Sequence, residues 1–334
     1  MRKIILSILC IVLLCACNGK QENNLPTKKG SSGKTLEILL VADENVYKGE
    51  TKLLIDSLFG RPQDGLNTPE PMFDVVNIPT SSFKNTEMFH VHRNVIMLDI
   101  NSENQNKVYL HHDKWSAPQI VFDFAAKNHT DLDTLFKKYY PRMLQEIYRA
   151  EHRRIIKAFN GTAGYEVMEK VKKQFGFELT VSGEFELARL ANPQPEMGWI
   201  RKETKDFGIG VLVHTQPYQD KKVFNEKNIL NQADSIMCHV GGPAENSYMG
   251  TERRVDAIFS ISDMPQSSYC IEARGLWRLF GDFMGGPYIS YTLLSPDEKQ
   301  VITLIAYVYS PRFDKRDYLM QVESICHSIK FNEK

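Results

Sequence analysis

The chain is organised around the stretch Arg274-Gly275-Leu276-Trp277-Arg278-Leu279-Phe280-Gly281-Asp282-Phe283-Met284-Gly285-Gly286-Pro287, which leads into a strand-like run over residues 288–293. The stretch holds four glycines, two arginines and one of the chain's three tryptophans. Glycine permits positive φ angles and close approach of neighbouring backbone segments. Tryptophan and arginine often anchor recognition surfaces. We therefore expect a glycine-rich loop at residues 274–287.

A second glycine-rich loop is expected at residues 241–254, which also contain Gly-Gly-Pro and a methionine. In one hypothesis the two loops meet at a single ligand- or partner-binding site. Its residues would be Arg274, Trp277, Met284, Tyr248, Met249 and Glu252. In the other hypothesis the glycines only turn the chain, Trp277 fills the core, and Arg274 pairs with Glu252 or Glu272. The residues alone leave both hypotheses open.

The N-terminus has the pattern of a bacterial lipoprotein signal. Met1-Arg2-Lys3 is a short basic head, residues 4–14 are almost wholly apolar, and Leu14-Cys15-Ala16-Cys17 resembles a lipobox. The apolar run is shorter than the roughly 20 residues that a membrane-spanning helix needs. We therefore expect residues 1–16 to be a signal peptide and Cys17 to be lipidated.

The expected lipid predicts where the protein resides. Three acyl chains on Cys17 would hold it on a membrane far better than one chain. Asn18 follows the cysteine, where an aspartate would indicate retention in the inner membrane. We therefore expect a lipid-anchored protein of the cell envelope, on the outer membrane and facing the periplasm. Residues 17–34 are polar, with several glycines and serines, and are interpreted as a flexible tether.

Composition limits the remaining possibilities. Without residues 1–16 the chain has 318 residues, enough for about two domains. Arg2 and Lys3 account for two of the 41 basic residues, so 39 basic residues would face 41 acidic ones, and no nucleic-acid partner is expected. Three cysteines follow Cys17, so at most one disulfide could form, and buried free thiols are expected. They are Cys238, Cys270 and Cys326.

Residues 35–160 are predicted to form an N-terminal α/β subdomain. Expected elements are strands at 36–42, 74–79, 93–100, 107–110 and 119–125, with a helix at 49–59. Helical periodicity then takes over, with Thr130 as the expected N-cap. Pro141 cannot continue a helix but suits a first turn, so we expect a second helix to begin there.

Residues 161–334 are predicted to form a C-terminal α+β subdomain. Expected elements are strands at 177–181, 199–202, 209–214, 257–261, 269–273, 288–293 and 301–309, with helices near 165–175, 229–236 and 318–329. Residues 211–217 and the helix after them resemble 306–311 and the helix after those, a pattern that would fit two related subdomains. The predicted fold class is α+β, with mainly antiparallel sheets packed by helices.

No motif names a chemistry. Gly30 to Thr35 end like a phosphate-binding loop, but Lys28 stands where its first glycine should be, and no strand precedes it. His90 and His92 could converge on a metal from one strand, yet no other ligand motif accompanies them, so hydrogen-bonding roles are expected. No nucleophile motif is present either. The sequence predicts no metal site and no cofactor.

Several short motifs together resemble one known family. They are Gly60-Arg61-Pro62, His92-Arg93-Asn94-Val95-Ile96, Trp115-Ser116-Ala117-Pro118-Gln119, Trp199-Ile200-Arg201-Lys202-Glu203-Thr204, Gly242-Pro243 with Ser247-Tyr248-Met249, Arg274-Gly275-Leu276-Trp277 with Met284-Gly285-Gly286-Pro287, and Val308-Tyr309-Ser310-Pro311 with Lys315-Arg316. With them the chain resembles the Bacteroidota lipoprotein family called domain of unknown function 4837, from about Leu36 to the C-terminus. The resemblance implies a lipidated envelope protein with no assigned activity.

The leading functional hypothesis is a non-catalytic lipoprotein that binds a small ligand or an envelope protein through the two glycine-rich loops. The alternatives are an envelope hydrolase of unrecognised type and a purely structural envelope protein. A cleft that exposes Arg274, Trp277 and Tyr248 would favour binding. A convergent histidine and carboxylate with a water-sized gap between them would favour the enzyme. A buried Trp277 with an ion-paired Arg274 would favour the structural role.

Overall fold

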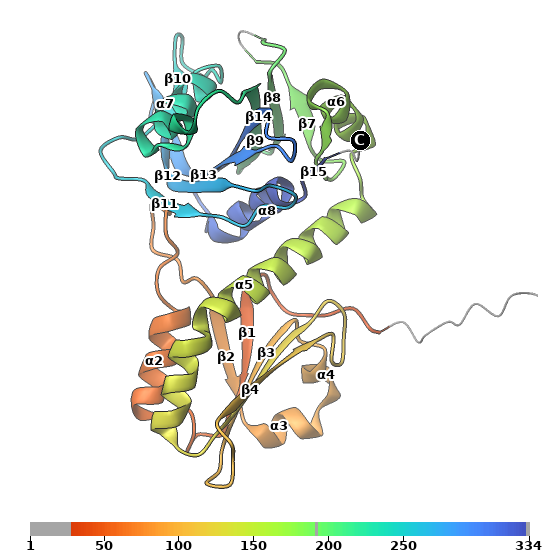
Figure 1. Cartoon of the computed structure of the whole chain (residues 1–334), viewed down its shortest axis with the longest axis vertical. Helices are drawn as coiled ribbons and strands as arrows, with labels where there is room; N and C mark the ends of the chain where they lie inside the picture. The colour runs from red at the N-terminus through yellow and green to blue at the C-terminus, as the bar shows by residue number, and fades with distance from the viewer. Residues whose placement is uncertain (1–27, 191–192, 332–334) are drawn as a thin grey trace, which may run out of the picture.

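The computed structural model describes residues 28–190 and 193–331, so the expected signal peptide and Cys17 lie outside the described residues. The chain forms two bodies, each built on its own sheet, and one long helix runs from the first body to the second (Figure 1). The predicted α+β class is confirmed. Within the described part of the chain, no helix is both long enough and apolar enough to cross a membrane.

The N-terminal body is a five-stranded sheet in the order β2-β1-β3-β5-β4. Its strands are β1 (Glu37–Val41), β2 (Asp74–Ile78), β3 (Asn94–Ile100), β4 (Lys107–His112) and β5 (Ile120–Ala126). All pairings are parallel except that of β4 with β5. Helices cover both faces, which explains why β1, β3 and β5 are apolar along most of their length. The sheet is therefore mixed, whereas the sequence alone suggests mainly antiparallel pairing.

The two faces of this sheet have separate cores. Helices α2 (Gly49–Phe59) and α5 (His129–Gly161) pack on one face, where Ile55, Phe59 and Phe136 meet Leu40 and Phe122. The short helices α3 (Thr80–Asn85) and α4 (Glu87–His90) cover the other face through Phe83 and Phe89.

Helix α5 is a single helix of 33 residues, which corrects two predictions. Its N-cap is Asn128, whose side chain accepts from the backbone N–H of Asp131 at 2.9 Å, and not Thr130. Pro141 lies inside the helix and starts no new one. Buried side chains on both sides of the proline, Phe136 and Met143 among them, keep the helix continuous despite the missing N–H. The helix changes direction between the part beside α2 and the part that reaches the second body (Figure 1).

The expected tether is shorter than predicted at its C-terminal end. Lys29 already accepts a backbone hydrogen bond from Ala117 at 2.9 Å. Ser32 donates its N–H to Val91 and accepts from Arg93 at 2.8 and 2.9 Å. Residues 29–32 therefore belong to the N-terminal body, because their backbone is held by its loops.

The C-terminal body is built on one larger sheet, in the order β10-β12-β13-β14-β9-β8-β7, with β11 also paired to β12. Its strands are β7 (Glu186–Ala188), β8 (Met197–Glu203), β9 (Gly208–Pro217), β10 (Tyr248–Thr251), β11 (Ile258–Ile261), β12 (Cys270–Phe280), β13 (Gly285–Leu294) and β14 (Gln300–Tyr309). Every pairing in it is antiparallel. A separate two-stranded ladder joins β6 (Phe177–Glu178) to β15 (Lys330–Phe331).

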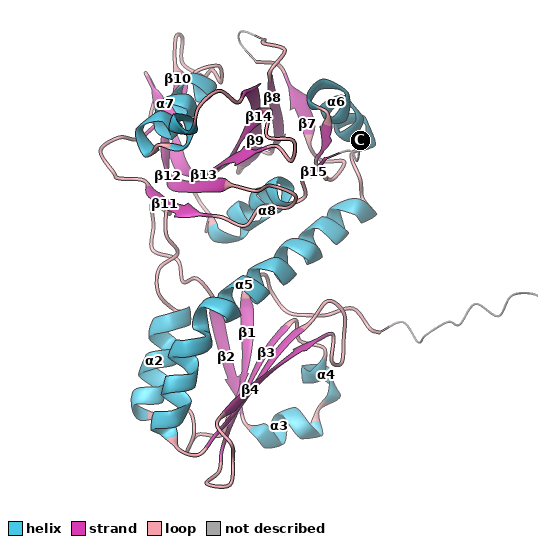
Figure 2. Ribbon diagram, in the orientation of Figure 1, coloured by secondary structure: helices cyan, strands magenta, loops and turns pink. Residues whose placement is uncertain are grey.

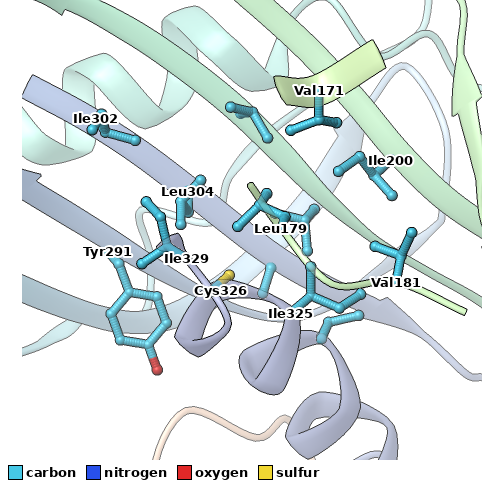
Figure 3. Packing of buried hydrophobic residues seen from close by; sticks show 14 of the residues in the cluster. Val171, Leu179, Val181, Ile200, Tyr291, Ile302, Leu304, Ile325, Cys326 and Ile329 are labelled. Atoms are coloured by element: carbon cyan, nitrogen blue, oxygen red, sulfur yellow. The ribbon is translucent and has the colours of Figure 1, made fainter. Parts of the chain in front are cut away.

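Helices cover both faces of the large sheet. On one face, α6 (Tyr165–Phe175) and α8 (Arg316–His327) enclose an apolar core that includes Val171, Ile325 and Leu304 (Figure 3). On the other face lies α7 (Glu226–Met237), preceded by the one-turn helix η1 (Lys221–Phe224). The echo between residues 211–217 and 306–311 therefore does not mark two separate units. These segments belong to β9 and β14, which pair directly in one sheet, and the helices that follow them pack on opposite faces.

The two bodies are joined by polar contacts around α8, which lies between the large sheet and α5 (Figure 2). The carboxylate of Glu70, 5% exposed, accepts the backbone N–H groups of Lys315 and Arg316 at 2.8–2.9 Å. A loop of the first body thus caps the N-terminus of a helix of the second. On α5, His152 Nδ1 lies 3.0 Å from Ser324 Oγ of α8.

Candidate functional site

The stretch at residues 274–287 is a β-hairpin, so the predicted glycine-rich loop there is corrected. Residues 274–280 form the second half of β12, and Gly285 begins β13. Only residues 281–284 turn the chain, with Gly281 at φ 83°. Gly286 serves close packing of strands, because a Cβ at this position would lie 2.1 Å from the carbonyl oxygen of Val308.

The strand geometry separates the two residues of greatest interest in this hairpin. Arg274 and Trp277 are three positions apart, and alternate residues of a strand point to opposite faces. Trp277 faces α7, is 4% exposed, and donates its indole N–H to the carbonyl of Val308 at 3.1 Å. Arg274 faces α8 and reaches Glu323 there. They cannot contact one ligand together.

Arg274 is the centre of a buried ion cluster. Its Nε lies 2.5 Å from Glu272 and its Nη2 lies 2.5 Å from Glu323, whose side chain is 5% exposed. Burial opposes the charge of Arg274, but Glu323 and Glu272 outweigh it and raise the pKa of the guanidinium. Burial raises the pKa of Glu323, which Arg274 opposes. The expected pairing with Glu272 is therefore observed, and Glu323 is an additional partner.

The second glycine-rich segment is also part strand, because Tyr248 to Thr251 form β10. Tyr248 is 43% exposed and stacks on Phe280 across the strand pair, with ring centroids 5.1 Å apart. Glu252 pairs with Arg254 and lies 3.6 Å from Arg278. The predicted convergence of six residues is therefore not observed, and the buried Trp277 with an ion-paired Arg274 is the arrangement that favours a structural role for these two residues. Tyr248 and Glu252 are linked through Phe280 and Arg278, since Arg278 lies over the Phe280 ring at 4.9 Å from its centroid, whereas Arg274 pairs with Glu272 and Glu323.

The other three predicted residues, Trp277, Met249 and Met284, do share a pocket. This cavity of about 410 Å³, here called the aromatic pocket, opens on the α7 face beside the segment Gly241-Gly242-Pro243. Rings and apolar side chains line it. They are Trp199, Trp277, Tyr307, Tyr309, Phe207, Leu279, Val240, Met249 and Met284. Residues 241–243 form one wall and the β8–β9 turn, residues 203–208, forms another.

Charged side chains surround the pocket. Arg201 lies over the ring of Trp199, 4.6 Å from its centroid, and pairs with Glu186 and Glu203 at 2.8 and 3.0 Å. Arg312 lies 3.6 Å from Asp206. Lys205 also lines the pocket and forms no ion pair with any residue that the structure describes. Lys205 is therefore a positive charge of the lining that has no carboxylate partner among the described residues.

Hydrogen bonds fix the rings of the pocket. The indole of Trp199 donates to the hydroxyl of Tyr307 at 2.9 Å. Burial raises the pKa of Tyr307, so this hydroxyl stays protonated, and its own hydrogen has no acceptor among the described residues. The Tyr309 hydroxyl likewise has no partner in the described chain. Both hydroxyls therefore have hydrogen-bonding capacity that no described protein group uses.

Sequence reasoning missed the floor of this pocket. Trp199 and Tyr309 stand in motifs that support the family resemblance, and Tyr307 lies in the predicted strand at 301–309, but no pattern assigned them to a site. They come from β8 and β14, which are distant in sequence and separated by β9 in the sheet. The strand period assigns each of Trp199, Trp277 and Tyr307 to one side of its own strand. It cannot show that the three sides coincide, because that depends on the strand order of the folded sheet.

The contact between His152 and Ser324 is not arranged as a base that activates a nucleophile. The hydroxyl of Ser324 is fully buried and donates to the carbonyl of Met320 at 2.7 Å, so His152 cannot take its proton without breaking that bond. His90 and His92 bond to the carbonyl of Phe83 and the carboxylate of Glu37 at 2.9 and 2.7 Å. Among described side chains, no group of three or more His, Cys, Asp or Glu could hold a metal ion.

Comparison with known families divides the chain into the same two parts. Residues 165–328 match the family model described as Domain of unknown function (DUF4837), and residues 31–160 match the model described as Domain of unknown function (DUF8532). The resemblance to domain of unknown function 4837 therefore holds for residues 165–328, and residues 31–160 match a different model. A search of curated proteins found no match.

Proposed function

We propose that this pair of domains belongs to a lipid-anchored envelope protein, and that the aromatic pocket of its C-terminal domain binds a small amphipathic ligand. The observation that carries the binding proposal is a cavity lined by two tryptophans and two tyrosines, with residues 241–243 as one wall. Pockets of this size with apolar linings and few polar groups are typical binding sites for small molecules.

The lining indicates the chemistry of the ligand. Ring faces favour a flat apolar surface, such as one face of a sugar or an aromatic ring. The hydroxyls of Tyr307 and Tyr309 supply hydrogen bonds at the floor. Lys205, without a carboxylate partner, favours a ligand with an acidic or electron-rich edge. Trp277 is largely buried, so it supports the pocket while presenting only a small part of its ring.

Tryptophan fluorescence tests the binding proposal directly. Trp199 and Trp277 line the pocket, and the chain's third tryptophan, Trp115, lies in the other body. In a Trp115→Phe protein, emission should respond only to the pocket. The probes are a disaccharide of N-acetylglucosamine, indole-3-acetate, and the small-molecule fraction of an envelope extract. We expect a saturable change in emission with at least one of them.

Two tyrosine variants locate the response. Tyr309→Ala removes a ring that lines the pocket, and should weaken binding by about tenfold or more. Tyr248→Ala removes an exposed ring of the neighbouring hairpin, outside the pocket, and should leave binding unchanged. The binding proposal fails if no probe alters the emission, or if the two variants weaken binding equally.

The anchor is tested separately. The lipobox-like residues 14–17 support lipid attachment at Cys17. Cys17→Ala should move the protein from the membrane fraction to the soluble fraction, while Cys238→Ala, at an exposed thiol, should not. Persistence of the Cys17→Ala protein in the membrane fraction would contradict the anchor without bearing on the pocket.

A further inference from the structure

The end of the large sheet opposite the aromatic pocket carries a second cavity with aromatic walls. Gly208, at the start of β9, lines the aromatic pocket, whereas Tyr218 follows the last of the ten residues of that strand, roughly 30 Å away. The cavity at Tyr218, here called the strand-end cavity, has a volume of about 570 Å³. It is lined by Tyr218, Lys221, Lys222, Phe224, Asn225, Tyr269 and Leu294. The two cavities are therefore separate sites.

Backbone hydrogen bonds at the ends of the strands hold the walls of this cavity. Tyr218 donates its N–H to the carbonyl of Lys299, which directly precedes β14, at 2.8 Å. Leu294, the last residue of β13, donates its N–H to the carbonyl of Tyr269, which directly precedes β12, at 3.0 Å. The sheet therefore fixes the backbone positions of the two tyrosines that line the cavity.

The three rings of the cavity contact one another and reach the surface. The ring of Phe224, from η1, has its centroid 6.2 Å from that of Tyr218 and 4.9 Å from that of Tyr269, to which it is nearly perpendicular at 86°. Tyr269 is 40% exposed. Exposed apolar surface that is contiguous and rimmed by polar residues marks an interaction site more often than scattered apolar residues do. The rings therefore offer an apolar surface to a ligand from solution.

The lining of the strand-end cavity is positively charged. Lys221 and Lys222 are both exposed, and none of the described residues that line the cavity is acidic. The carboxylate of Asp220 lies 3.7 Å from Lys222, but the two side chains are 53% and 82% exposed, so water screens this pair. Lys221 forms no ion pair within the described part of the chain. A negatively charged ligand would therefore complement the lining.

We propose that the strand-end cavity binds an acidic saccharide. The three rings match the apolar faces of sugar rings, and the two lysines match a carboxylate on the sugar. The phenol groups of Tyr218 and Tyr269 can donate hydrogen bonds to sugar hydroxyls and accept them. A neutral sugar or an acyl chain would gain nothing from the charge of the lysines. This proposal is independent of ligand binding in the aromatic pocket.

Isothermal titration calorimetry of the full chain with trigalacturonic acid tests the proposal. This trisaccharide presents sugar faces and carboxylates together. We expect saturable binding within about 10 mM ligand, a concentration that fills a site with a millimolar dissociation constant. Maltotriose, a neutral trisaccharide, should bind about fivefold more weakly or less. The proposal is overturned if trigalacturonic acid gives no saturable heat, or if the two trisaccharides bind equally.

Paired lysine variants separate this site from a general effect of net charge. Lys221→Gln combined with Lys222→Gln should weaken the binding of trigalacturonic acid about fivefold or more, and both positions are exposed, so the fold should tolerate the change. Lys137→Gln combined with Lys138→Gln is the matched control, because it removes two adjacent exposed charges from α5 and should leave the affinity unchanged. Equal weakening by the two pairs would overturn the proposal.

A ring variant and a lipid control complete the test. Tyr269→Ala should weaken binding about tenfold, whereas Tyr165→Ala, which removes a ring that is 72% exposed on α6, should not change it. Unchanged affinity in Tyr269→Ala would overturn the proposal. Vesicles of phosphatidylglycerol offer an anionic lipid headgroup instead of a sugar. If the protein sediments with these vesicles through Lys221 and Lys222 but does not respond to trigalacturonic acid, the saccharide is overturned in favour of a lipid headgroup.

Discussion

Replacing Arg274 with methionine should destabilise the protein strongly, although the hairpin that carries it suggests a recognition loop. The substitution keeps most of the side-chain length and removes the charge that Glu272 and Glu323 share. Glu323 is 5% exposed and would retain only the 3.3 Å hydrogen bond from Tyr291. It would then be a buried carboxylate without a counter-charge.

The magnitude follows from the burial of the cluster. Removing one partner of a buried ion pair typically costs about 3–5 kcal/mol, because the remaining charge is left uncompensated. Arg274 has two such partners, so we expect a loss in this range in the free energy of unfolding. Adding Glu323→Gln to Arg274→Met should recover part of the loss, since the second change removes one of the two stranded charges.

Urea denaturation of the purified variants, followed by circular dichroism, measures these changes. Arg278→Met is the matched control, because Arg278 lies on the same strand with a side chain 37% exposed and should tolerate the change. The reasoning would be refuted if Arg274→Met unfolded at the same urea concentration as Arg278→Met. It would also be refuted if the double variant were less stable than Arg274→Met alone.

Three further predictions concern the junction of the bodies and the packing of the sheet. Glu70→Gln should lower the free energy of unfolding by about 1–2 kcal/mol, because the carboxylate that caps α8 loses its charge. Urea titration measures the loss, and an unchanged midpoint would contradict a stabilising role of this cap. Burial lowers the pKa of His152 and also that of His327, to about 4, so the unfolded chain binds protons more readily than the folded one. The free energy of unfolding should therefore fall as pH drops from about 6.5 towards 4, by up to about 1.4 kcal/mol per pH unit for each ring. A free energy of unfolding that does not change over this pH range would contradict the prediction. Gly286→Ala should lower the free energy of unfolding by about 3 kcal/mol or more, because the added Cβ would collide with the backbone of β14. At Gly161 an added Cβ meets no atom within 4 Å, so Gly161→Ala should leave the melting temperature unchanged.

Local patterns were sufficient to find most elements of this chain. The helix at 49–59 and the glycine end of the helix at 165–175 follow from periodicity and from Gly176, which adopts φ 79°. The strand at 301–309 follows from a continuous apolar run. These features depend on residues that are close in sequence, so the sequence alone is sufficient to predict them.

Prediction failed where distant contacts override local preference. Pro141 indicates a helix start, yet packing on α2 and on β5 carries one helix through it. The glycines of residues 274–287 indicate a loop, yet three of them, Gly275, Gly285 and Gly286, stand in register in the pairing of β12 with β13. Local propensity is a weak prior when burial on both sides of a residue favours another conformation.

The sequence by itself determined the class of the fold, the division into two bodies and the residue types available for a site, because periodicity, turns and composition are local properties. Only the tertiary structure decided which residues meet. Strand order brought Trp199, Trp277 and Tyr307 to one face, and strand parity sent Arg274 to the other, where α8 supplied Glu323. The physical reason is that side chains alternate along every strand, so a single register and a single strand order, fixed by burial across the whole sheet, assign each side chain its neighbours.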